Sequence, residues 1–92
     1  MTGPVRYKRN SAVSATELDG EIFLVEPESE EVFYLDAMGA ALWRLIAVPQ
    51  SLEEAIAVYQ AAFPGTDRQT LEIDLRAALR SLADRGLAVV VP

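Results

Sequence analysis

The first third of the chain consists of short extended segments separated by turn residues, and apolar and polar positions alternate weakly over the first of these segments. Asp19-Gly20 separates two extended segments, and this dipeptide favours a two-residue hairpin because glycine tolerates a positive φ. A turn at Pro27–Glu30 follows the second segment. Residues Met1–Asn10 are expected to form either a loose tail or a short first strand. The pattern predicts an antiparallel meander with strands Ser11–Leu18, Glu21–Glu26 and Glu31–Leu35.

The last two predicted strands are apolar on both faces. In the second strand, Ile22 and Leu24 point to one face, and Phe23 and Val25 point to the other. A sheet with one solvated face normally alternates between apolar and polar residues. We therefore expect the second face to be partly covered, either by helices or by a partner.

Helical spacing begins after the third predicted strand. Asp36 is the expected N-cap of a first helix over about Ala37–Val48, which the following proline ends. Ser51 and Glu54 have the S-x-x-E spacing of a capping box, so a second helix begins there. Pro64-Gly65 ends this second helix.

A third helix is expected to begin at Thr66 or Asp67 and to continue to about Arg85. Gly86 follows as its C-terminal cap, and Leu87–Val91 forms a final extended segment. The apolar stripe of this helix is Leu71, Leu75, Ala78, Leu79 and Leu82. The sequence thus predicts a single α+β domain over residues 1–92, with a three-stranded antiparallel N-terminal sheet packed on a three-helix, winged-helix-like bundle.

Composition narrows the range of functions. Hydrophobic residues make up 51% of the chain, which is enough for a core, but no apolar run is long enough to span a bilayer. Cysteine and histidine are both absent, so disulfides, the usual zinc ligands and histidine-based proton transfer are excluded. We expect a protein that is not an enzyme and that has no metal or cofactor. Because no targeting segment is visible, we expect it in the cytoplasm and not at a membrane.

The charge is strongly negative and unevenly distributed. The net charge is −6, and eight acidic residues but no Lys or Arg lie between Asn10 and Trp43. The helix order resembles a winged helix-turn-helix, in which the third helix would enter the DNA major groove. That helix carries Glu72, Asp74 and Asp84, which would face phosphates. A DNA-binding regulator therefore stays only as an alternative, and we expect no nucleic-acid partner.

The strand Glu31–Leu35 comes last in the meander and is expected to lie at an edge of the sheet, with unpaired backbone groups. An edge of this kind is either an ordinary structural edge or a site where an extended peptide adds as a further strand. The same edge could pair with a second copy, which predicts at most a weak homodimer. Three acids beside it would steer a basic peptide towards it: Glu28, Glu30 and Glu31.

The order and spacing of these elements resemble a known family. The segments are DGEIFLVEPESEEVFYLDAMGAALWRLI, the Ser51-Leu52-Glu53-Glu54 opening of the second helix, and DLRAALRSLADRGLAVV. Together they resemble the PqqD-like recognition elements of ribosomally synthesised and post-translationally modified peptides (RiPPs). The resemblance covers about Leu18 to Val91. Asp36 stands where the family commonly has Asn, and both residues cap helices.

The resemblance implies that the protein binds the leader segment of a precursor peptide and presents it to a separate leader peptidase or other modifying enzyme. The leader would add as a strand beside the third strand and against the third helix. The implied platform is Val32, Phe33, Tyr34 and Leu35. The implied helix wall is Leu75, Arg76, Ala78, Leu79, Arg80 and Leu82. Arg76 or Arg80 would pair with a leader acid, although ordinary surface exposure is the alternative for each.

Two pathways are compatible with a stand-alone member of this family. The aromatic VFYLD strand and the Leu42-Trp43 pair favour a lasso-peptide pathway by analogy. The alternative is a chaperone of the pyrroloquinoline quinone (PQQ) precursor. A small subunit that only stabilises a larger enzyme by docking is a third hypothesis.

Overall fold

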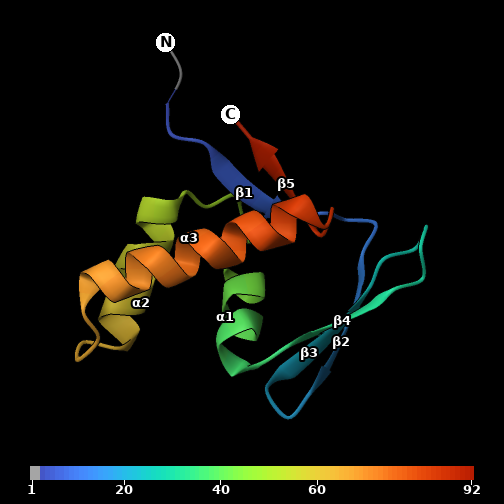
Figure 1. Ribbon diagram of the computed structural model, residues 1–92, viewed down its shortest axis with the longest axis horizontal. Coiled ribbons are helices and arrows are strands. Elements are labelled where there is room, and N and C mark those ends of the chain that lie inside the picture. The colour runs from blue at the N-terminus through green and yellow to red at the C-terminus, as the bar shows by residue number, and fades with distance from the viewer. Residues whose placement is uncertain (1–2) are drawn as a thin grey trace.

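The computed structural model describes residues 3–92, so Met1 and Thr2 of the predicted N-terminal segment lie outside the described residues. Two small sheets flank a three-helix bundle (Figure 1). The strands are β1 (Arg6–Arg9), β2 (Ser14–Leu18), β3 (Glu21–Val25), β4 (Val32–Leu35) and β5 (Ala88–Val91). The helices are α1 (Ala37–Leu45), α2 (Leu52–Ala62) and α3 (Arg68–Asp84). The α+β class and the three-stranded antiparallel sheet are confirmed.

The predicted meander is the sheet β2-β3-β4, in which β3 is central. Asp19 and Gly20 have φ values of 52° and 84°, the positive pair that a tight hairpin between β2 and β3 requires. In the register, Phe23 lies opposite Tyr34 and Ile22 lies opposite Leu35. Both β2 and β4 are edge strands of this sheet.

The two faces of the β2-β3-β4 sheet have different surroundings. Ile22 and Leu24 on the inner face are buried and pack in the core beside α1. On the opposite face Val32 and Tyr34 are 64% and 53% exposed. The helices lie on one side of the sheet only (Figure 1), so among the described residues the expected cover of the second face by helices is not found.

Local capping chemistry sets the helix starts. Asp36 accepts the Gly39 N–H at 2.9 Å, and Ser51 and Glu54 form both bonds of the predicted capping box. Asp67, and not Thr66, caps α3. Helix α1 ends at Leu45, three residues before the predicted end at Val48, and Ile46 is its C-cap. The α conformation is disfavoured for Val48 because it directly precedes a proline.

Part of the N-terminal segment, Arg6–Arg9, forms strand β1 and is not a loose tail. Strand β1 pairs antiparallel with β5, with Arg6 opposite Val91. The other edge of β1 is also occupied, because Tyr7 and Gln50 exchange backbone hydrogen bonds of 2.7 and 3.0 Å. The Arg9 guanidinium lies 5.2 Å from the Trp43 ring centroid and donates to the Trp43 carbonyl. These contacts fix the second sheet against α1.

The core lies where β3, the three helices and the start of β5 meet. Its largest fully buried side chains are Leu24, Leu42, Ile46, Ile56, Leu79 and Leu87. Over residues 3–92, no helix combines the length and apolar character needed to cross a bilayer.

Candidate functional site

Strand β4 has one paired edge and one open edge. Glu26 donates its backbone N–H to the Glu31 carbonyl at 3.1 Å, just beyond the β3–β4 ladder. Hydrogen-bonded and non-hydrogen-bonded pairs alternate along an antiparallel ladder. Because Glu31 is in a hydrogen-bonded pair, Phe33 and Leu35, two and four residues further on, also direct their backbone N–H and C=O groups towards β3. The backbone N–H and C=O groups of Val32 and Tyr34 therefore point away from β3. Within residues 3–92 they have no backbone partner.

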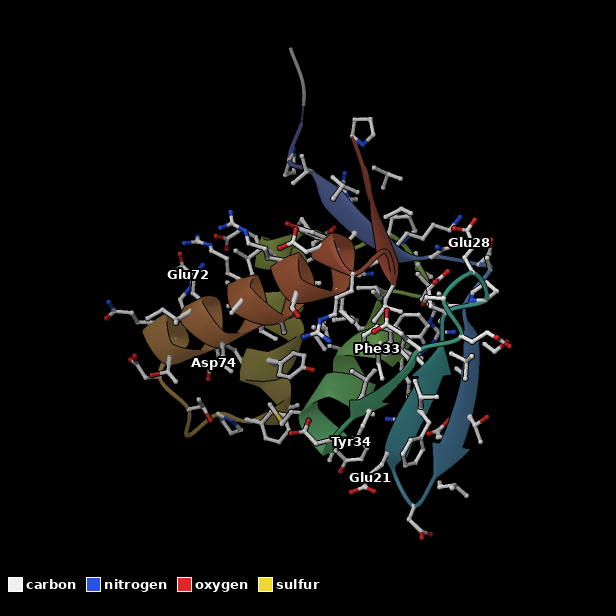
Figure 2. All side chains as sticks on the ribbon, turned by 45° about the vertical axis from the view of Figure 1, so that its right-hand side comes forward. Glu21, Glu28, Phe33, Tyr34, Glu72 and Asp74 are labelled. Atoms are coloured by element: carbon white, nitrogen blue, oxygen red, sulfur yellow. The ribbon has the colours of Figure 1, made fainter. Side chains whose placement is uncertain are left out.

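A hollow of about 220 Å³ separates β4 from the C-terminal half of α3. Phe33 and Leu35 line it from the strand, Ser81 and Leu82 line it from α3, and Arg85 lines it from the C-cap position of α3. Figure 2 shows Phe33 on the side of β4 that faces the helices, and Tyr34 beside Glu21. The Arg85 guanidinium lies 5.3 Å from the Phe33 ring centroid, which is within the range of a cation–π contact.

A second hollow of about 250 Å³ continues this space past the end of β4. It lies between the start of α1, Tyr59 of α2, and the middle of α3. Met38, Leu42 and Leu75 give it a largely apolar wall, with Asp36 and Asp74 also lining it. The two hollows share one side of α3, which we call the groove side. Its residues are Asp74, Leu75, Ala78, Ser81, Leu82 and Arg85.

Two tyrosines near these hollows are held as neutral phenols. The Tyr59 hydroxyl donates to the Met38 carbonyl at 2.9 Å; burial, and secondly the charge of Asp36, raise the pKa of Tyr59 to about 12. The Tyr34 hydroxyl donates to Glu21 Oε2 at 2.7 Å, and this bond raises the pKa of Tyr34 above its ordinary value. Both groups are therefore hydrogen-bond donors at neutral pH.

The structure divides the predicted site residues into two groups. Phe33, Tyr34, Leu35, Leu75, Ala78 and Leu82 line the two hollows, and Val32 lies on the open strand. Arg76 and Arg80 are instead on the opposite side of α3, where they line a separate hollow beside Tyr7 and Leu52. Arg76 is ion-paired with Glu72 at 2.8 Å.

Leu79 lies between these two sides and is fully buried in the core. Sequence reasoning did not select Ser81 and Arg85, which line the groove side. The sequence does contain an indication of both residues. Side chains three or four positions apart share one side of a helix, and this spacing relates Asp74, Ala78, Ser81 and Arg85.

The predicted steering acids occupy the turn between β3 and β4. The Glu26 carboxylate holds this turn by accepting hydrogen bonds from the Ser29 hydroxyl, the Ser29 backbone N–H and the Glu28 backbone N–H. These bonds, the first of them most strongly, lower the pKa of Glu26. Glu28, Glu30 and Glu31 are exposed. Glu28 and Arg85 line a further hollow of about 460 Å³. The charged turn therefore stands at the entrance to the space between β4 and α3.

Comparison with solved structures shows where this arrangement has been seen. The chain matches the structure titled "TbiB1 in Complex with the TbiA(beta) Leader Peptide" with a TM-score of 0.80 and 34% sequence identity. The match covers 89% of this chain and 94% of that chain. The fold with its open strand is thus the fold of a protein that has been solved with a leader peptide bound.

Residues 21–88 match the family described as Coenzyme PQQ synthesis protein D (PqqD), while a comparison with curated proteins finds no match. The chain belongs to the PqqD family and is a PqqD-like RiPP recognition element. The resemblance noted in the sequence is confirmed.

Proposed function

We propose that this protein binds the leader segment of a ribosomally synthesised precursor peptide by strand addition to β4. The observation that carries the proposal is the outward direction of the Val32 and Tyr34 backbone groups, next to a groove walled by α3. The structural match to a protein solved with a leader peptide supports it.

The bound leader gains affinity from two sources. Its main chain bonds to the N–H and C=O groups of Val32 and Tyr34, and each such bond contributes about 1 kcal/mol net. Its inward side chains fill the two hollows against Leu75, Ala78 and Leu82. Because hollows of this kind usually carry most of the binding energy, a few leader residues determine the affinity.

Charge adds selectivity at the groove. Glu28, Glu30 and Glu31 favour the approach of a leader with basic residues. Arg85 is the base on the groove side of α3, and it offers a partner for a leader carboxylate near Phe33. This role replaces the one that the sequence suggested for Arg76 and Arg80.

The protein acts as an adaptor and does not catalyse a reaction itself. It presents the precursor to a separate leader peptidase or other modifying enzyme, and we place it in a lasso-peptide pathway in the cytoplasm. The family description favours one second candidate, a chaperone of the PQQ precursor. The two candidates differ in the precursor that binds, so titration with each precursor separates them. At high concentration β4 also pairs weakly with a second copy, and the leader displaces that copy.

Amide hydrogen exchange with and without the TbiA(beta) leader peptide tests the binding mode. We expect the Val32 and Tyr34 amides to exchange quickly in the free protein and slowly in the complex. The Phe33 and Leu35 amides are already bonded to β3 and serve as the internal control. Protection of the β2 or β5 edge in place of β4 would contradict the proposal. So would a lack of binding both by this peptide and by the precursor encoded beside the protein.

A further inference from the structure

The face of the β2-β3-β4 sheet that points away from α1 is an apolar surface, and its β2 and β3 side chains lie away from the leader groove. Directly opposite residues of an antiparallel ladder share a face, so Val25 lies beside Val32, and Phe23 lies beside Tyr34. We call this surface the outer face. Its members are Ser14, Thr16, Leu18, Glu21, Phe23, Val25, Val32 and Tyr34.

The outer face combines exposed and partly exposed apolar side chains. The Phe23 and Tyr34 rings pack with centroids 5.5 Å apart, and Leu18, Val32 and Tyr34 are each more than half exposed. Contiguous apolar surface of this kind, rimmed by polar residues, marks an interaction site. The helices of the described chain pack on the opposite face only, so the outer face is free for another molecule.

Charge identifies the kind of partner. No Lys or Arg occurs between Ser14 and Leu35. Glu21 lies on the outer face itself, and the acidic turn with Glu28 and Glu30 lies at one end of it. A second copy would bring these carboxylates towards one another, which is unfavourable. The complementary surface is a protein surface with an apolar centre and Lys or Arg at its margin.

We propose that the outer face is the docking surface for the enzyme that modifies the precursor, and that the bound leader forms part of this surface. The inference rests on the proposed function. Successive side chains of a strand point to opposite faces, so every second side chain of a leader strand beside β4 continues the outer face. The enzyme then contacts Phe23, Val32 and the leader together, and it binds the loaded protein more tightly than the empty one.

The test uses the purified modifying enzyme and precursor encoded beside the protein. The variants are Phe23→Thr and Val25→Thr, because both positions lie on β3 away from the leader edge and threonine keeps β propensity. Val58→Thr is the control, since it removes an exposed apolar side chain from α2, which does not belong to the outer face. Leader affinity, precursor conversion and enzyme affinity are measured for each variant.

For Phe23→Thr we expect leader affinity within about twofold of the native protein and a loss of roughly tenfold in enzyme affinity and in conversion at low enzyme concentration. The control keeps all three values. Enzyme affinity falls as salt rises and increases when the leader is bound. Native conversion by folded Phe23→Thr and Val25→Thr, equal losses in Val58→Thr, or equal enzyme affinity with and without leader would each overturn the inference. Absence of leader binding by the native protein would instead overturn the proposed function.

Discussion

The replacement of Val32 by proline isolates the backbone contribution to leader binding. Proline removes one backbone N–H, and the geometry of β4 directs that N–H towards the open edge and not towards β3. Val32 is 64% exposed, so little apolar packing is lost. Proline is tolerated in an edge strand when its missing donor faces solvent. We therefore expect the free energy of unfolding to change by less than about 1 kcal/mol.

The effect on binding is larger. One main-chain hydrogen bond contributes about 1 kcal/mol net, which alone weakens the Kd about fivefold. The proline ring also occupies the position in which a leader carbonyl would lie, so we expect a total loss of roughly tenfold. Fluorescence anisotropy with labelled TbiA(beta) leader peptide measures the Kd, and urea denaturation measures stability.

Two matched variants make this result decisive. Val32→Thr keeps the N–H and should bind with nearly native affinity. Phe33→Pro removes a backbone N–H that bonds to β3. It should therefore lower the free energy of unfolding several-fold more than Val32→Pro does. The strand-addition geometry is refuted if folded Val32→Pro binds the leader as well as Val32→Thr does, or if Val32→Pro and Phe33→Pro are equally unstable.

Three further predictions concern stability and titration. Leu79→Ala should destabilise the fold by about 2 to 5 kcal/mol in urea denaturation, because Leu79 is fully buried; a change confined to leader affinity would contradict this placement. The pKa of Glu54 is lowered, first by the Ser51 backbone N–H and then by Arg6. Its stabilising effect is therefore present above the ordinary pKa of 4.5 and is lost as the pH falls, so Glu54→Gln should be less stable than the native protein at neutral pH but not in acid. Tyr59 should remain protonated until about pH 12, so a titration followed by phenolate absorbance should show a step near that pH. That step should be absent from Tyr59→Phe.

Features that depend on neighbouring residues could be predicted from the sequence. The hairpin at Asp19-Gly20 and the capping box of Ser51 and Glu54 follow from local backbone chemistry, and both are present. Asp67 could not be preferred over Thr66, because both side chains can cap a helix. The pairing of β1 with β5 joins the two ends of the chain, and no local pattern indicates a contact of that range.

The groove side of α3 was predicted only in part, for a related reason. The apolar stripe of Leu71, Leu75 and Leu79 shows which side of the helix enters the core, but it does not show which flank of that stripe faces β4. That choice depends on how α3 is placed relative to the sheet. Arg80 on one flank and Ala78 on the other were therefore equally good candidates for the helix wall.

The antiparallel pairing of Arg6 with Val91 brings the beginning and the end of the described chain together, on the part of the molecule away from the β2-β3-β4 sheet (Figure 1). A tether at either terminus, such as a sensor surface, a fluorescent protein or a fused enzyme, would start from this shared corner. β4 and the outer face would both stay accessible in such a fusion. Immobilised protein is therefore suitable for capturing leaders and their enzymes in the same experiment.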